Sequence, residues 1–178
     1  GTIATLRRFK QEGKIRAFGI STHERRSAPE FANEFGLDML MLRYNAAHPG
    51  AEREIFPHLA TRRPGTVAFT ATRWGTLLDP RFTPQGEATP LPSDCYRFAL
   101  SSPHVDVCLA GPKDGAQLDQ ALLALDRGPM SAEELSWMRR VGASVRAQTA
   151  TRRRFSPVDL LDRLASLSIC GPRQLARG

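Results

Sequence analysis

The sequence repeats one pattern along most of its length: a short apolar run of strand length, then a segment whose apolar residues recur with helical spacing. The apolar runs cover residues 15–20, 38–42, 66–70 and 105–110, and each round takes roughly 30 residues, the length of one βα unit. Neighbouring parallel strands need a crossover connection, which is usually a helix. The sequence therefore predicts four parallel strands joined by helices, an α/β fold.

Helix signals support this division of the chain. The first helical pattern covers residues 2–12 and ends before Gly13, and the second opens near Pro29 and ends at Gly36. Proline favours the first turn of a helix, and glycine favours the position after the last turn. A third, short helix is bent near Pro57, and a fourth begins near Ser93.

A longer helix is predicted after the fourth unit. Ser131 and Glu134 have the spacing of a capping box, in which each side chain accepts a hydrogen bond from the other residue's backbone amide. The helix then carries an apolar stripe that we expect to pack against the domain, made of Leu135, Met138, Val141 and Val145.

Four βα units are too few to close a parallel barrel, which needs eight units and typically about 250 residues. The chain has 178 residues and begins with Gly1 at the edge of a helical pattern. We therefore expect a partial (β/α)8 TIM barrel, and a sequence that starts inside a longer protein. The barrel part should cover residues 1–150, and residues 151–178 should form a basic linker and a short amphipathic helix. The proline-rich loop at residues 79–92 follows the third strand and is a candidate lid.

Composition argues against several classes of protein. No apolar run reaches the roughly 18 to 20 residues that span a bilayer, and no signal-peptide pattern is seen, so we expect a cytoplasmic protein without a membrane partner. Cys95, Cys108 and Cys170 share no close spacing, which predicts neither disulfides nor a metal site. The net charge of +7 comes mostly from scattered arginines without interleaved aromatic residues. This distribution argues against a nucleic-acid partner and equally suits the mouth of a site for a phosphorylated cofactor.

Residues 13–22, GKIRAFGIST, resemble the helix end and fifth strand of the aldo-keto reductases, where a GKIR stretch leads to glycine, a hydrophobic residue, serine and asparagine. Further matches follow in the family's order at residues 44–45 (YN), 74–78 (WGTLL) and 110–120 (AGPKDGAQLDQ). The resemblance covers residues 1–126 and implies strands five to eight of the barrel. The expected fold is therefore four C-terminal βα units plus C-terminal helices.

The resemblance implies a cradle for NADP. In the family, the serine and asparagine that end strand five hold the nicotinamide carboxamide, which implies this role for Ser21, with Thr22 in place of the asparagine. The segment from Gly111 to Gln120 resembles the loop and helix N-terminus that bind phosphate and adenosine. Within it, Lys113 would face a cofactor phosphate, and Gln117 and Gln120 would lie near the adenosine.

Read without the resemblance, the same residues have simpler explanations. Ser21 and Thr22 could cap the following helix. Lys113 could be a solvated side chain on a turn before a helix that points Leu118 and Leu122 inward.

The sequence also departs from the family. Met41 stands where strand six supplies a glutamine to the carboxamide, and Ala121 stands where an adenine-binding asparagine is frequent. Thr70 aligns with a tyrosine that stacks on the nicotinamide, and Phe69 is then expected to point to the opposite face. The family's catalytic tyrosine, lysine, aspartate and histidine lie on the first four strands, so no catalytic residue is assigned here. His48 is the histidine expected at the active face.

The function implied for the full-length protein is NADP(H)-dependent hydride transfer between the cofactor and a small carbonyl or alcohol substrate, with this chain inactive alone. One alternative is a non-enzymatic cofactor-binding or regulatory protein on the same scaffold, which Met41, Thr70 and the basic tail favour. Another is a half-barrel that pairs with itself.

Overall fold

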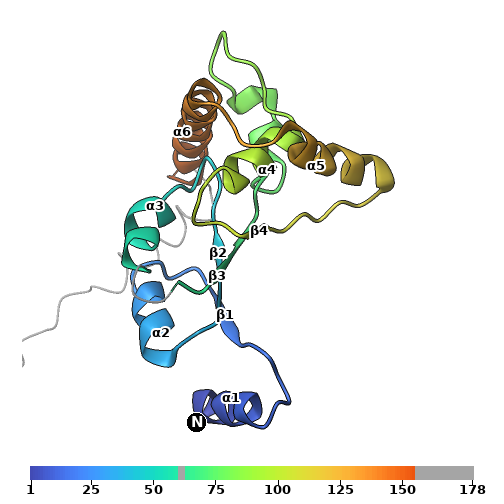
Figure 1. The fold of residues 1–178 in the computed structure, drawn as a ribbon. Helices are drawn as coiled ribbons and strands as arrows, with labels where there is room; N and C mark the ends of the chain where they lie inside the picture. Colours follow the sequence, from blue (N-terminus) through green and yellow to red (C-terminus); the bar gives the residue numbers. More distant parts are fainter. Residues whose placement is uncertain (60–62, 155–178) are drawn as a thin grey trace, which may run out of the picture.

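The computed structural model describes residues 1–59 and 63–154. Four strands form one sheet in the order β1-β2-β3-β4, and each neighbouring pair is parallel, as predicted (Figure 1). A helical segment follows each strand, so the chain has an α/β fold. The strands are β1 (Gly19–Thr22), β2 (Met39–Arg43), β3 (Gly65–Phe69) and β4 (Val107–Cys108).

Glycines end the first two helices where the sequence predicts it: Gly13 and Gly36 have φ of +71° and +62°, which L side chains adopt only with strain. Among the described residues, no helix is long and apolar enough to cross a membrane. The helical elements are α1 (Thr2–Gln11), α2 (Ala28–Phe35), α3 (Ala51–Glu54), η1 (Phe56–His58), η2 (Thr76–Leu78), η3 (Pro80–Phe82), α4 (Pro92–Leu100), α5 (Gly115–Arg127) and α6 (Ala132–Arg154).

The two edge strands are shorter than predicted. β1 begins at Gly19 instead of Ile15, because its ladder starts opposite Met39, the first residue of β2. β4 contains only Val107 and Cys108, which pair with Val67 and Ala68 of β3. An edge strand has one neighbour, so its length is set by that neighbour and not by its own apolar run.

The side chains on one face of the sheet are buried, whereas those on the other face are partly exposed. On one face, Leu40 and Leu42 of β2 and Thr66 and Ala68 of β3 are almost fully buried. On the opposite face, Met39, Val107 and the nearby Leu109 are 40%, 48% and 44% exposed. We call this second surface the open face. Parallel sheets are normally covered on both faces, so the described residues form a sheet with one wall missing.

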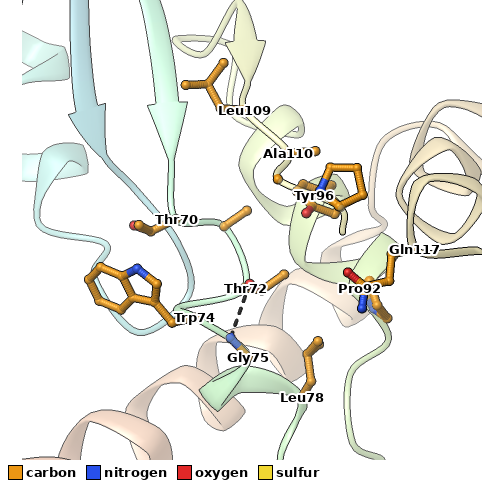
Figure 2. A pocket seen from close by; sticks show the side chains of 13 residues that line it. Thr70, Thr72, Trp74, Gly75, Leu78, Pro92, Tyr96, Leu109, Ala110 and Gln117 are labelled. Carbon is orange, nitrogen blue, oxygen red and sulfur yellow. Dashed lines mark hydrogen bonds between the residues drawn. The ribbon is translucent and has the colours of Figure 1, made fainter. Parts of the chain in front are cut away.

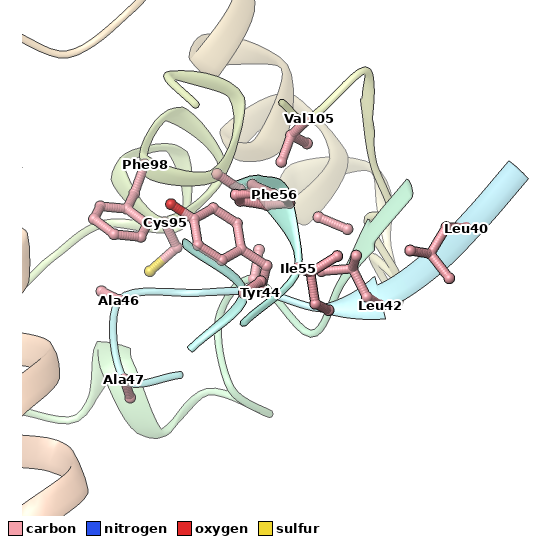
Figure 3. Close-up of a cluster of buried hydrophobic side chains, with 14 of the residues drawn as sticks. Leu40, Leu42, Tyr44, Ala46, Ala47, Ile55, Phe56, Cys95, Phe98 and Val105 are labelled. Carbon is pink, nitrogen blue, oxygen red and sulfur yellow. The ribbon is translucent and has the colours of Figure 1, made fainter. Parts of the chain in front are cut away.

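The core lies on the covered face and joins the sheet to α3, α4 and α6 (Figure 3). The ring of Tyr44 lies 5.4 Å from that of Phe56 and 5.7 Å from that of Phe98. Its hydroxyl donates to Glu52 at 2.6 Å, and both Glu52 oxygens accept from Arg139 of α6, at 2.9 and 3.0 Å. These bonds satisfy the polar atoms of a tyrosine that is only 2% exposed.

The cysteines do not form a disulfide within the part of the chain that the structure describes. Cys95 is buried among the core residues and Cys108 is half-buried on β4, and both are free thiols. Cys170 lies outside the described residues.

Helix α6 packs as its sequence predicts. The capping box is present: the Glu134 amide donates to the Ser131 hydroxyl at 3.2 Å, and the Ser131 amide donates to the Glu134 carboxylate at 2.8 Å. Met138, Val141 and Val145 are buried. A Cβ on Gly142 would lie 2.2 Å from the Ala46 carbonyl oxygen, so only glycine lets α6 approach the loop after β2.

The C-terminal boundary stays a prediction. Helix α6 runs to Arg154, past the linker start expected at residue 151, and the predicted amphipathic helix in residues 155–178 lies outside the described residues.

The proline-rich loop after η2 is held on α6 at three points. Trp137 donates its indole N–H to the Ala88 carbonyl at 3.1 Å, and Gln148 donates to the Phe82 carbonyl at 3.3 Å. Arg140 forms an ion pair with Glu87. Any lid movement of residues 79–92 would have to break these contacts.

Candidate functional site

A cleft of about 570 Å³ opens between the C-terminal ends of β3 and β4 (Figure 2). One wall is the turn after β3, another is the segment that leads from β4 into α5, and α4 contributes Pro92 and Tyr96. The C-terminal edge of a parallel sheet is where α/β proteins bind their ligands. The lining residues are Thr70, Ala71, Thr72, Trp74, Gly75, Leu78, Pro92, Tyr96, Leu109, Ala110, Gly111, Pro112 and Gln117.

The turn after β3 has a strained backbone. Thr70, Arg73 and Trp74 have positive φ of 59°, 52° and 52°, in the left-handed region that disfavours residues with a Cβ. The Asn45 side chain donates to the Thr70 carbonyl at 2.8 Å, and the Arg73 amide donates to the same oxygen at 2.9 Å. Such conformations cost roughly 1 to 3 kcal/mol each and cluster at binding sites.

This turn leaves backbone donors without partners. The amides of Ala71, Thr72 and Trp74 make no hydrogen bond to any other group in residues 1–59 and 63–154. Ala71 is only 2% exposed. Of the three residues only Ala71 is buried, and a buried backbone amide is nearly always paired, so its unpaired amide suits an acceptor-rich ligand together with the more exposed amides of Thr72 and Trp74.

The N-terminus of α5 forms the other side of the cleft and already holds a carboxylate. Asp114 is the N-cap and accepts from the Gln117 amide at 2.8 Å, while the Gln117 side-chain oxygen accepts from the Lys113 amide at 3.1 Å. Lys113 is exposed and makes no ion pair with a described residue. Sequence reasoning missed Asp114, although an aspartate directly before a helix is a common N-cap.

The predicted cofactor residues are only partly brought together. Gly111 and Gln117 line the cleft, whereas Ser21, Thr22, Lys113 and Gln120 do not. Ser21 is exposed on the open face, in register with Met41 and Val67, so two strands separate it from β4. The Thr22 hydroxyl accepts from the Glu24 amide at 2.9 Å, a local turn contact.

Phe69 lies on a different face from the one predicted. It is the last residue of β3 and shares the open face with Val67, while Thr70 has already left the strand. The ring of His23, just after β1, meets Phe69 edge to face at 5.5 Å. Counting by two from the buried Thr66 and Ala68 would have placed Phe69 correctly.

Helix α5 does not point Leu118 and Leu122 inward, as the simpler explanation of this segment expected. Leu118 and Leu122 are 44% and 47% exposed, so they do not point inward, and Ala124 is its one buried residue. Helix α5 follows the edge strand β4, and no other element of the described residues buries these two leucines.

His48 lies in the loop after β2, at the C-terminal edge of the sheet. Its amide donates to the Asn45 side-chain oxygen at 2.9 Å, and its Nδ1 lies 3.2 Å from the same oxygen. Burial, followed by the positive charges of Arg43, Arg73, Arg25 and Arg146, lowers the pKa of His48 to about 4. The ring is therefore neutral at pH 7.

The two tyrosines lie in different surroundings: Tyr44 is bonded to Glu52 in the core, and Tyr96 lines the cleft with a pKa raised by burial. No group of three metal-ligating side chains occurs among the described residues. The site offers backbone donors, apolar walls and a nearby lysine, which are groups that can bind an acceptor-rich ligand.

Structural comparison relates this fold to known enzymes. The chain is similar to the aldo-keto reductase AKR11C1 from Bacillus halodurans, with a TM-score of 0.66 and 24% identity for the holo form, over 79% of this chain and 55% of that one. The apo form gives a TM-score of 0.65 and covers 56% of the enzyme. A protein assigned as a 2,5-diketo-D-gluconic acid reductase B matches with a TM-score of 0.61 and 18% identity, over 78% of this chain and 50% of that one.

Sequence comparison finds no family model that matches the chain and no curated protein that matches it significantly. The chain spans about half the length of the structures it resembles. Over that span, it has the fold of the aldo-keto reductases.

Proposed function

We propose that the chain is the C-terminal half of an NADP(H)-dependent aldo-keto reductase barrel, and that it binds the cofactor while the other half supplies the proton-transfer residues. The observation that carries the proposal is the cleft between the β3 turn and α5, with three unpaired amides on one wall. When bound, the nicotinamide would supply the hydride chemistry. A complete protein would transfer a hydride between this cofactor and a carbonyl or alcohol substrate.

Groups in and near the cleft can be matched to the pyrophosphate, a planar ring and the 2′-phosphate of a dinucleotide. The amides of Ala71, Thr72 and Trp74 can donate to a pyrophosphate without any side-chain charge. The apolar walls contributed by Leu78, Leu109 and Tyr96 suit a planar ring. Lys113, on the segment that enters α5, is the cation available for a 2′-phosphate.

The open face supports the half-barrel part of the proposal. Ser21, Met41, Val67 and Phe69 follow one another across this face, which in a closed barrel would be the interior. Phe69, and not the aligned Thr70, is the aromatic candidate for contact with the nicotinamide, because Phe69 lies on the same face as Ser21.

Cofactor titrations of Lys113→Ala test the proposal. A charge-assisted hydrogen bond is worth roughly 1.5 to 3 kcal/mol, so the dissociation constant for NADPH should rise about tenfold or more, while that for NADH stays nearly unchanged. The nicotinamide fluorescence of the reduced cofactors measures both constants.

Lys14→Ala is the matched control, because Lys14 is also an exposed lysine but pairs with Glu12 near α1, away from the cleft. It should leave both affinities unchanged. Equal losses for NADPH and NADH in Lys113→Ala would remove Lys113 from the phosphate site. Failure of the unmutated chain to bind either cofactor would contradict the proposal itself.

A further inference from the structure

Asn45 is a fully buried polar residue that joins the loop after β2 to the turn after β3. It is 0% exposed. Its side-chain nitrogen donates to the Thr70 carbonyl at 2.8 Å, and its side-chain oxygen accepts from the His48 amide at 2.9 Å. Buried polar groups need hydrogen-bond partners, so a side chain that finds them in two different loops holds the loops together. Asn45 therefore fixes how the β3 turn lies against the loop after β2.

The two bonds of Asn45 are not equally replaceable. The His48 amide also donates to the backbone carbonyl of Asn45 at 2.9 Å, so it keeps a partner when the side chain is lost. The Thr70 carbonyl has a second donor as well, the Arg73 amide at 2.9 Å, but that donor belongs to the turn itself. The bond from Asn45 to Thr70 is therefore the contact that ties the head of the turn to the end of β2.

Thr70 needs such a tie because its backbone conformation is unfavourable. Its φ is +59°, which a β-branched residue rarely adopts. Conformations of this kind persist when the surrounding contacts hold them in place. Thr70 stands at the head of the turn that brings Ala71, Thr72 and Trp74 to the cleft (Figure 2). Rotation about the Thr70 backbone would move every peptide group that follows, so the positions of the unpaired amides depend on this residue.

We propose that Asn45 is a positioning residue for the cofactor: its bond to the Thr70 carbonyl holds the β3 turn in the conformation in which the three unpaired amides can bind the pyrophosphate. This inference rests on the proposed function for the identity of the ligand, whereas the hold on the turn is a property of the cofactor-free chain. NADPH and NADH share the pyrophosphate, so loss of the hold weakens both cofactors alike. The role differs in this respect from that of Lys113, which concerns the 2′-phosphate alone.

Asn45→Leu tests the proposal in the full 178-residue chain. Leucine is close to asparagine in shape but cannot donate to the Thr70 carbonyl. The dissociation constants for NADPH and NADH should both rise about tenfold. The matched control is Thr66→Val, which removes the hydroxyl of another fully buried residue, near the N-terminal end of β3 and away from the turn. It should change both constants by less than about twofold.

A second measurement reads the turn without any cofactor. The chain has two tryptophans, so in a Trp137→Phe background Trp74 is the sole source of tryptophan fluorescence. The fluorescence anisotropy of Trp74 should fall in Asn45→Leu, because the turn that carries Trp74 is no longer tied to β2. It should stay unchanged in Thr66→Val.

A third variant separates the hold on the turn from general damage to the core. Thr70→Gly removes the Cβ that disfavours a positive φ, so adding it to Asn45→Leu should recover at least about threefold of the lost affinity for both cofactors. Absence of this recovery would show that Asn45→Leu acts through the core, and would contradict the proposal. An anisotropy that Asn45→Leu leaves unchanged, or changes of equal size in Thr66→Val, would overturn it. If the unmutated chain binds neither cofactor, the cofactor assignment is rejected, and the anisotropy alone decides whether Asn45 holds the turn.

Discussion

Asp114 places a carboxylate at the start of α5, next to two residues that line the cleft, Pro112 and Gln117. Its carboxylate takes the Gln117 amide, one of the donors that a phosphate would otherwise use at the start of α5. It also follows Lys113 directly, so a cofactor phosphate near the lysine would meet a negative charge one residue away. The unpaired amides of the β3 turn carry no such competing group.

Asp114→Asn should therefore bind NADPH more tightly. Asparagine is as good an N-cap as aspartate, so α5 keeps its cap while the charge is removed. We expect the dissociation constant for NADPH to fall by roughly threefold to tenfold, in line with the worth of one charge near a helix N-terminus. Asp126→Asn, at the other end of α5, is the control and should leave the constant unchanged. A weaker NADPH complex in Asp114→Asn would mean that the carboxylate helps binding.

At the residue scale, the sequence predicted that Gly111 and Gln117 lie at one site, but it did not predict the direction of Phe69. Gly111 and Gln117 reach the cleft because they are fixed by the short path from β4 into α5. Phe69 was placed on the opposite face because the alignment put Thr70 inside the strand, whereas the strand ends at Phe69, which shares its face with Val67. The positive φ of Thr70 and Trp74 could not be foreseen, since neither residue type favours that region.

Among the elements, Arg97 joins α4 to the connection between α5 and α6. The side chain is 5% exposed, and its guanidinium donates to both oxygens of Glu134, at 2.6 and 2.8 Å. It also donates to the carbonyls of Gly128 and Pro129, at 2.9 and 3.2 Å. The pair with Glu134 lowers the pKa of that carboxyl from its ordinary value of 4.5 to about 2.

Glu134→Gln should destabilise the chain by about 1 to 2 kcal/mol, because it removes the nearer of the two carboxylates that pair with the buried Arg97 and leaves only Asp94, at 3.8 Å, while Glu134 itself is partly exposed. Glu133→Gln, in the same turn, should have a much smaller effect, since the carboxylate of Glu133 bonds to the Ser131 hydroxyl and no cation. Urea unfolding followed by circular dichroism measures both variants. Similar losses for the two would contradict the role given to Arg97.

The same pair predicts a dependence on pH. A carboxyl whose pKa is lowered by folding stabilises the fold above its ordinary pKa, and that contribution disappears as the pH falls from about 4.5 to about 2. The stability difference between the unmutated chain and Glu134→Gln should therefore shrink over this range. A difference that stays constant down to pH 2 would show that the pair is not its source.

Element types were predictable where a local signal is strong. Gly13 and Gly36 end helices, and the Ser131–Glu134 capping box begins one, because each is decided by neighbouring backbone groups. The extents of β1 and β4, and the outward direction of Leu118 and Leu122, depend on which elements lie beside them. The sequence of a segment alone does not show which elements will lie beside it, so these features could not be predicted.

Within residues 1–59 and 63–154, the molecule has an open sheet face, two sheet edges and an outward leucine stripe on α5. Exposed strand edges and apolar faces promote association. We predict that the 178-residue chain dimerises or forms larger assemblies when expressed alone. Val107→Lys should reduce this association, whereas Leu91→Lys, at a residue 53% exposed before α4, should not. A monomer by light scattering with a cooperative thermal transition would contradict the half-barrel account.

The central claim is that a nicotinamide cofactor binds in the cleft between β3 and α5, and energy transfer from tryptophan to bound NADPH tests it most directly. Trp74 lines the cleft, whereas Trp137 lies on α6 and bonds to Ala88. We expect saturable, tryptophan-sensitised NADPH emission that is largely lost in Trp74→Phe and retained in Trp137→Phe. Absence of saturable emission, or emission that Trp74→Phe leaves unchanged, would contradict it.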